Sequence, residues 1–244
     1  MNPVYKIARD NLARLRESGY PGRGILLGLT PSGKELVVMY WIMGRSPSSQ
    51  NRILHKEGHT VMTVPFDRSL EMKGEHLKIY NASTQRGKAF IVSNGRQTDA
   101  IADHLDKAGG FEESLRCWAF EDDGPIFTPR ISGLVFAGDV QSVYKLSVIK
   151  ALEQNPELLS RQFFEYANPL PGCGHCVHTY SLSQTCAPFS GEPYWAPVLE
   201  GVEENADCYW NSLPVDKRVA IYVKHIDRVT GAYRDKIINL HHTG

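Results

Sequence analysis

Residues 24–43, GILLGLTPSGKELVVMYWIM, contain two apolar segments separated by a short polar break. Segments 24–30 and 34–43 are rich in aliphatic, β-branched and aromatic side chains, which favour strands. The break, Thr30-Pro31-Ser32-Gly33, has turn chemistry, because proline fixes φ and glycine accepts a positive φ. The stretch therefore predicts a β-hairpin, and the rest of the chain can be followed outward from it.

Before the hairpin, apolar residues recur at helical spacing and basic residues lie between them. The apolar positions are Val4, Ile7, Ala8, Leu12 and Leu15. This pattern predicts an amphipathic helix that ends at the glycine and proline of segment 19–21. Helices of this kind usually cover a core, so we expect packing to be its role.

After the hairpin, strand-like composition returns repeatedly. Strands are predicted at residues 59–66, 77–80, 88–93, 131–137, 142–149, 162–166, 176–182, 218–226 and 232–240, with turns at Asn94-Gly95 and Gly138-Asp139. Between residues 99 and 120 the spacing of apolar residues predicts two helices separated by Gly109-Gly110. Thr98 or Asp99 is the predicted cap of the first helix. A short helix is predicted at 205–213, and the Pro-rich segments 168–172 and 187–197 are predicted to be loops. This order predicts an α+β layered domain with mostly antiparallel sheets.

Composition narrows the class of protein. Of the 244 residues, 42% are hydrophobic, and 27 basic residues balance 27 acidic ones. We expect one domain over residues 1–244 and a small-molecule partner, since no basic face suggests nucleic-acid binding. Five cysteines, an odd number, are atypical of a disulfide-bonded secreted protein. No apolar run is long enough for a signal peptide or a membrane span, so the sequence predicts a cytoplasmic protein with no membrane contact.

Residues 120–133, FEDDGPIFTPRISG, combine acidic residues, two prolines and an arginine ahead of a predicted strand. Proline restricts φ, so the side chains of this loop are held in place. Glu121 is a candidate acid or base, and Arg130 is its neighbour or a ligand to the substrate. An ion pair within the loop accounts for the same charges equally well.

Three further polar clusters lie at the ends of predicted strands. Segment 44–52, GRSPSSQNR, offers Arg45 and Arg52 beside several hydroxyls, which suits a phosphate dianion and equally a solvated basic turn. Tyr80-Asn81 ends a strand, where a tyrosine more often packs. Segment 94–99, NGRQTD, opens a helix, where backbone N–H groups and amides either hold a polar ligand or form a cap.

Segment 173–178, CGHCVH, gathers four residue types that bind zinc. On a strand, His175 and Val177 face one way while Cys176 and His178 face the other, so the four ligands cannot converge without a tight turn. We therefore predict packing cysteines and no metal. The sequence has no dinucleotide fingerprint, P-loop, nucleophile elbow or His-Glu-x-x-His motif, and no cofactor is predicted.

Taken in order, these segments resemble the archaeal-type IMP cyclohydrolase family, including its bacterial members. The likeness runs from about Tyr20 through Pro193, and segments in a shared order are far more specific than any one of them. It departs after Tyr180, where the family tends to carry a Gly-Asp-Gly-like turn and this chain reads SLSQTC. The matching segments are Tyr20-Pro21-Gly22-Arg23-Gly24, Met43-Gly44-Arg45-Ser46 with Asn51-Arg52, Tyr80-Asn81, Ser93-Asn94-Gly95-Arg96-Gln97-Thr98-Asp99, Thr128-Pro129-Arg130-Ile131-Ser132-Gly133, and His178-Thr179-Tyr180 with Glu192-Pro193.

The resemblance implies a four-layer αββα fold like that of the N-terminal nucleophile hydrolases, without a self-processing nucleophile. It implies closure of the formamido-imidazole-carboxamide ribonucleotide FAICAR to IMP with loss of water, in de novo purine biosynthesis. In that reaction a weakly nucleophilic carboxamide nitrogen attacks a formyl carbon, so the enzyme must move protons, while the substrate itself supplies proximity. No metal or redox cofactor is required.

By resemblance, Tyr80 and Glu121 move these protons, and Asp122 is a candidate to tune Glu121 by like-charge repulsion. Residues 1–19 look like an addition to the short archaeal chains, with contacts in a homo-oligomer as one role. Two other functions stay open: a purine-nucleotide-binding homologue that has lost turnover, and an amide hydrolase acting on a related small substrate. The resemblance implies that the remaining candidates bind the purine ribonucleotide. Arg45 and Arg52 are the candidates for its phosphate. The candidates for other parts of the substrate are Arg23, Asn81, Asn94, Thr98, Asp99 and Arg130.

Overall fold

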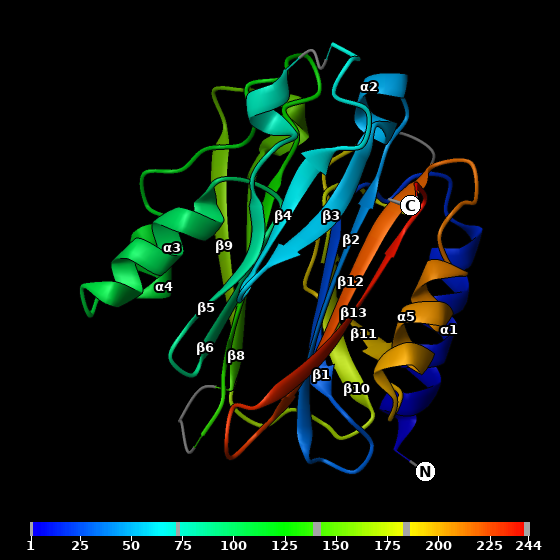
Figure 1. The fold of residues 1–244 in the computed structure, drawn as a ribbon, viewed down its shortest axis with the longest axis vertical. Coiled ribbons are helices and arrows are strands. Elements are labelled where there is room, and N and C mark those ends of the chain that lie inside the picture. Colours follow the sequence, from blue (N-terminus) through cyan, green and yellow to red (C-terminus); the bar gives the residue numbers. More distant parts are fainter. Residues whose placement is uncertain (1, 72–73, 139–142, 183–185, 242–244) are drawn as a thin grey trace.

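The computed structural model describes residues 2–71, 74–138, 143–182 and 186–241. Within these residues, thirteen strands form two sheets that pack face to face (Figure 1). Every strand pair described is antiparallel. The predicted α+β class with antiparallel sheets is confirmed.

The first sheet has six strands in the order β11-β10-β1-β2-β12-β13. Its centre is the predicted hairpin, in which Leu29 pairs with Leu36 across the turn. Its strands are β1 (Gly24–Leu29), β2 (Glu35–Met43), β10 (Cys173–His178), β11 (Tyr194–Pro197), β12 (Arg218–Asp227) and β13 (Tyr233–Asn239).

The second sheet has seven strands in chain order, β3 to β9, so each strand pairs with the next along the sequence. At its first edge, β3 lies against the first sheet, where Asn239 of β13 bonds both the N–H and the C=O of Leu54 at 2.8 and 3.1 Å. Its strands are β3 (Arg52–Glu57), β4 (Thr60–Pro65), β5 (Asn81–Arg86), β6 (Ala89–Ser93), β7 (Arg130–Phe136), β8 (Tyr144–Ala151) and β9 (Leu159–Tyr166).

Strand β2 is buried on both of its faces, which explains its continuous apolar sequence. Val38, Tyr40 and Ile42 point into the layer between the sheets, whereas Met39 and Trp41 pack under helices. Because successive side chains of a strand face opposite sides, one apolar run fills two cores at once. The hairpin therefore sets the position of both layers beside it.

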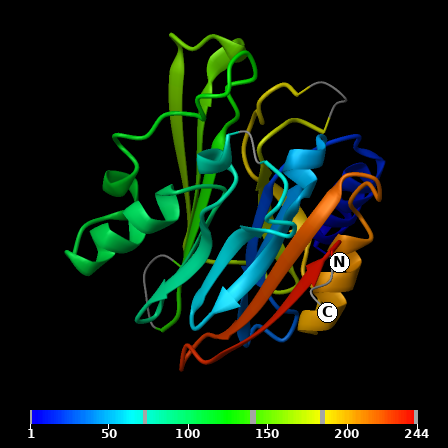
Figure 2. The ribbon, with the colours of Figure 1, turned by 45° about the horizontal axis from the view of Figure 1, so that its top comes forward.

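Helices cover the outer face of each sheet (Figures 1 and 2). Helices α1 (Pro3–Glu17) and α5 (Val202–Trp210) pack on the six-stranded sheet, and α3 (Gln97–Asp106) and α4 (Phe111–Ser114) pack on the seven-stranded one. The helix predicted before the hairpin is confirmed, and it buries Leu12 and Leu15. None of the helices in the described residues is long and apolar enough to cross a membrane.

Some predicted elements are wrong. Residues 77–80 are not a strand, because Glu75–Leu77 forms a 3₁₀ turn and the strand, β5, begins one residue after Tyr80. The predictions omit β3 and assign β11 to a loop. Both of these strands are short. The predictions also omit β5, because its sequence, NASTQR, is polar. Pairing with neighbouring strands overrides such a weak local preference.

The predicted boundaries of other elements also shift. Helix α3 begins at Gln97, and neither Thr98 nor Asp99 caps it, because the flanking residue is Arg96 and makes no side-chain cap. The second helix ends at Ser114, earlier than predicted. Strand β10 ends at His178, whereas the prediction continued to residue 182. The predicted turn at Gly138-Asp139 includes Asp139, which lies outside the described residues.

Candidate active site

A cavity of about 630 Å³ lies where β2 ends and β1 begins. Its lining includes cations, carboxylates and hydroxyls from segments that are far apart in the sequence. The polar lining residues are Tyr20, Arg23, Arg45, Ser46, Ser49, Arg52, His76, Lys78, Glu121, Asp122, Asp123, Thr128 and Tyr180.

Arg23 enters the cavity just before β1. Its backbone N–H donates to Thr179 Oγ1 at 3.2 Å, which ties this segment to the end of β10. The preceding residue, Gly22, has a φ of +77°, and a Cβ there would lie 2.1 Å from Thr179 Oγ1. Only glycine fits this close approach without strain, so the glycine of the Tyr20–Gly24 motif fixes the position of Arg23.

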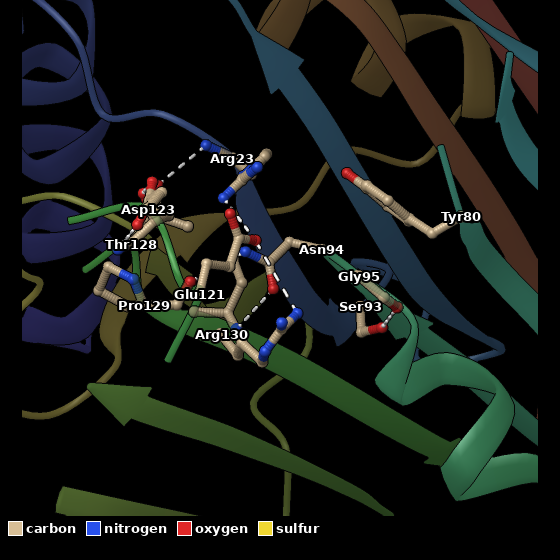
Figure 3. A network of polar contacts seen from close by, with 12 residues as sticks. Arg23, Tyr80, Ser93, Asn94, Gly95, Glu121, Asp123, Thr128, Pro129 and Arg130 are labelled. Atoms are coloured by element: carbon tan, nitrogen blue, oxygen red, sulfur yellow. Dashed lines mark hydrogen bonds and ion pairs between the residues drawn. The ribbon is translucent and has the colours of Figure 1, made fainter. Parts of the chain in front are cut away.

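Glu121 lies between two guanidinium groups (Figure 3). Its Oε1 is 2.9 Å from Arg23 Nη2 and 4.0 Å from Arg130 Nη1, and the residue is only 2% exposed. Burial raises the pKa of the Glu121 carboxyl above its ordinary value, and the charges of Arg23 and Arg130 offset part of that rise. The ion pair considered from sequence therefore exists, but its closer partner is Arg23 and not the arginine of the same loop.

Arg130 is held mainly by neutral groups. Its Nε donates to the Ala119 carbonyl at 3.0 Å, its Nη1 donates to Gln97 Oε1 at 3.2 Å, and its guanidinium lies over the Trp118 ring. These contacts fix the guanidinium beside Glu121 without a full ion pair. Its charge therefore acts on the carboxyl and on whatever binds next to it.

Tyr80 lies beside this group and outside the cavity lining, with its hydroxyl directed toward the Arg23 side (Figure 3). The Tyr80 hydroxyl is 2.7 Å from the hydroxyl of Tyr40, a residue of β2 with no exposed surface. Burial raises the pKa of Tyr40 well above its ordinary value, so Tyr40 stays a neutral phenol. The two tyrosines therefore share a buried hydrogen bond.

Arg52 presents an unpaired donor. The residue is 2% exposed, and two of its nitrogens donate to the carbonyls of Ser49 at 2.8 Å and Met43 at 3.3 Å. Its Nη1 is buried and has no partner within the described residues. A buried guanidinium nitrogen without an acceptor is costly, and Arg52 belongs to the cavity lining, so this guanidinium is suited to an anionic ligand.

Arg45 also lines the cavity, but it is more exposed. Its guanidinium lies 4.7 Å from the centre of the Tyr20 ring, and Nη1 is 2.7 Å from Cys186 Sγ. Ser46 begins the short helix α2 (Pro47–Gln50) and closes a capping box with Ser49, so both hydroxyls are held at the cavity wall. The structure thus brings Arg23, Arg45, Arg52 and Glu121 together around one cavity.

Four other predicted residues lie outside the cavity lining: Asn81 begins β5, Asn94 follows β6, and Thr98 and Asp99 lie in α3. Asn94 donates to the Pro129 carbonyl at 2.9 Å, and its Oδ1 accepts from Gln97 Nε2 at 2.9 Å and from the Ile131 N–H at 2.8 Å. Thr98 is buried against the Gly95 carbonyl, and Asn81 donates to Asp99 at 2.8 Å. The contacts of Asn94 with Pro129 and Ile131 join the end of β6 to the start of β7, so they position the loop that carries Glu121.

Sequence reasoning missed several lining residues. Tyr20 and Tyr180 stack with ring centres 5.7 Å apart, and both belong to the matching segments, although neither was a candidate site residue. Thr128 and Asp123 belong to the loop at residues 120–133, yet no pattern in that loop predicted that they line the cavity. Lys78 donates to Ser48 at 3.1 Å, and burial together with the charge of Arg52 lowers its pKa; nothing in its sequence context singles it out.

The Cys173–His178 segment forms β10 and alternates as predicted. Val177 points between the sheets and Cys176 points toward the helices. His175 Nδ1 lies 2.7 Å from the Tyr144 hydroxyl. Among the described residues, no three Cys, His, Asp or Glu side chains are grouped so that they could hold a metal ion.

Comparison with known proteins identifies the family of the chain. The family model described as IMP cyclohydrolase-like protein matches residues 20–231. A protein of Haloquadratum walsbyi named IMP cyclohydrolase is 25% identical over 158 residues, which cover 62% of this chain and 73% of that protein. One of Methanocaldococcus jannaschii with the same name is 30% identical over 119 residues, or 48% of this chain and 56% of that protein. The family match spans most of the chain, so the chain belongs to the IMP cyclohydrolase-like protein family.

Proposed function

We propose that this protein is an IMP cyclohydrolase, which closes FAICAR to IMP with loss of water. Family membership supports the reaction class. The observation that carries the proposal is the buried Glu121 carboxyl, which lies between the Arg23 and Arg130 guanidinium groups at the wall of the cavity and whose pKa is raised by burial. A small anionic substrate with a reacting amide fits these groups.

The chemistry assigns a role to each group beside Glu121. The carboxamide nitrogen adds to the formyl carbon, and the formyl oxygen gains negative charge as the new N–C bond forms. The Arg23 and Arg130 guanidinium groups are placed to stabilise that charge. In this proposal the Glu121 carboxylate accepts the proton that leaves the carboxamide nitrogen and returns it to the oxygen. The oxygen then departs as water with a second hydrogen, which the formamido nitrogen gives up as the C–O bond breaks and the ring C=N bond forms.

Tyr80 is the second residue that the proposal assigns to proton transfer. Its hydroxyl is directed toward the Arg23 side and bonds Tyr40. We propose that it shares the proton transfer with Glu121. Asp122 lines the cavity next in sequence to Glu121, in keeping with a tuning role.

The phosphate would bind at the Arg52 end of the cavity. Arg52 contributes its unpaired Nη1 and Arg45 a second positive charge, while Ser46 and Ser49 contribute the capped start of α2. Asn81, Asn94, Thr98 and Asp99 would then act indirectly, by holding the strand ends and the Glu121 loop.

The fold supports a further comparison. The outer helices and the two facing sheets are consistent with the αββα layering of N-terminal nucleophile hydrolases, which we propose as its fold class. We also propose one domain over residues 1–244, because α1 packs on the first sheet and Asn11 donates to the Trp195 carbonyl of β11 at 2.9 Å. Action in the cytoplasm and assembly into a homo-oligomer are part of the same proposal.

The test is product analysis with purified protein and FAICAR. We expect IMP to form, and we expect Tyr80→Phe to lower kcat by roughly 10²-fold, the scale of a lost proton-transfer group. Binding of FAICAR and IMP without ring closure would indicate the nucleotide-binding alternative. Release of formate without IMP would indicate an amide hydrolase.

A further inference from the structure

Three cavity-lining residues that no role above uses are joined by hydrogen bonds in a row. Asp123 accepts from the Thr128 N–H at 2.7 Å and from the Thr128 hydroxyl. The Thr128 oxygen is also 2.6 Å from the Tyr180 hydroxyl. Tyr180 follows β10, whereas the other two residues belong to the loop that carries Glu121, so the row joins two distant parts of the chain at one wall.

The direction of each hydrogen bond in this row follows from the groups themselves. A carboxylate only accepts, so the Thr128 hydroxyl donates its one hydrogen to Asp123. The Thr128 oxygen can then only accept from Tyr180, which must donate its own single hydrogen. Burial raises the pKa of the Tyr180 phenol, so the hydrogen stays on its oxygen. The Tyr180 oxygen is left with lone pairs alone for any ligand.

The row is held firmly and lies next to the proposed reacting group. Thr128 and Tyr180 are 2% and 5% exposed, and the Tyr180 ring stacks on Tyr20. The Tyr180 N–H donates to the Pro21 carbonyl at 3.1 Å. The Thr128 carbonyl accepts from the Glu121 N–H at 2.8 Å, so the same residue positions both the phenol and the carboxyl.

We propose that Tyr180 is a specificity-determining residue, whose oxygen accepts the N–H of the carboxamide nitrogen in the substrate and of N1 in the product. The ligand class rests on the proposed function, whereas the direction of the hydrogen bonds does not. Asp123 and Thr128 are positioning residues: they engage the only hydrogen of the Tyr180 hydroxyl, so Tyr180 cannot donate a hydrogen bond to the ligand. In a purine nucleotide whose N1 lacks hydrogen, N1 is itself an acceptor and cannot form a hydrogen bond with the Tyr180 oxygen. Such a nucleotide should therefore bind poorly.

Calorimetric titration with two nucleotides tests this. IMP carries hydrogen at N1, whereas purine riboside 5′-monophosphate has a bare N1 and no group at position 6. Wild-type protein should bind IMP more tightly by roughly 10-fold or more, the scale of one mismatched hydrogen-bonding group. In Thr128→Val the freed Tyr180 hydroxyl can donate, so the ratio should fall to about 3-fold or less, while Thr128→Ser should keep the wild-type preference.

Tyr180→Phe gives an independent reading, because it removes the oxygen and leaves the stacked ring. This substitution should weaken IMP binding and abolish the preference for IMP, while the affinity for purine riboside 5′-monophosphate stays unchanged. The inference is overturned if wild-type protein binds the two nucleotides equally, or if Thr128→Val or Tyr180→Phe keeps the full wild-type ratio. If wild-type protein binds neither nucleotide, the proposed function fails as well, and this result is distinct from binding without preference.

Discussion

Replacing Arg52 by lysine tests the phosphate end of the cavity. Arg52 is 2% exposed and donates to two backbone carbonyls, which leaves its Nη1 without a partner in the described residues. Lysine keeps the positive charge, but its single nitrogen cannot satisfy the carbonyls and also reach a ligand. The substitution therefore removes one directed bond and leaves the net charge of the site unchanged.

The expected loss follows from that one bond. A hydrogen bond between charged partners contributes about 1.5–3 kcal/mol, which corresponds to IMP binding that is weaker by roughly 10- to 150-fold. Inosine, which has the same base and sugar but no phosphate, should bind Arg52→Lys and wild-type protein with similar affinity. The phosphate is therefore the part of the ligand that reports on Arg52.

Isothermal titration of IMP and inosine against Arg52→Lys gives this comparison. Arg86→Lys is the matched control, because Arg86 forms a surface ion pair with Asp106 at 2.9 Å, in which both side chains are exposed. The control should bind IMP as wild-type protein does. The reasoning is refuted if Arg52→Lys keeps its IMP affinity, or if it loses affinity for inosine to the same extent.

Other parts of the structure give three further predictions. Tyr40→Phe removes the hydroxyl bonded to Tyr80 at 2.7 Å and should lower kcat by about 10-fold with KM nearly unchanged, measured by steady-state kinetics. Gly174→Ala would place a Cβ 2.5 Å from a backbone carbonyl of β1 and should reduce the unfolding free energy in urea by about 1–3 kcal/mol. Burial lowers the pKa of His175 and His178 to about 4, from 6.5. The unfolded chain therefore binds more protons between these values, and stability should fall with pH below 6.5, by up to about 1.4 kcal/mol per pH unit for each histidine. Urea unfolding at pH 7 and pH 5 checks this, and an equal stability at both would contradict it.

The elements predicted best are those in which composition and turn chemistry agree. The apolar run of β2 and the Thr30–Gly33 turn leave few alternatives to a hairpin. Strand β5 was missed because its sequence, NASTQR, has no apolar alternation, and its neighbours β4 and β6 supply the pairing that makes it a strand. Local preference cannot reveal an element that only its partners stabilise.

The candidate site was predictable to a similar degree. Charged residues in short motifs pointed to Arg23, Arg45, Arg52 and Glu121, which the fold gathers at one cavity. Asn94 has a side chain equally suited to a ligand, but backbone groups of β7 and the preceding loop use its hydrogen-bonding capacity. Sequence reasoning has no access to such competition between partners, because the partners lie far apart along the chain.

Glu121 is the residue on which the proposed mechanism depends, so its replacement tests the central claim most directly. The measurement is the rate of IMP formation from FAICAR by wild-type protein, Glu121→Gln and Glu112→Gln. Glu112 is the matched control, since it pairs with Lys145 at 2.8 Å on the outer face of the second sheet. We predict a loss of roughly 10²-fold or more in Glu121→Gln and a wild-type rate in Glu112→Gln. IMP formation by Glu121→Gln at the wild-type rate, or none by wild-type protein, would contradict the account.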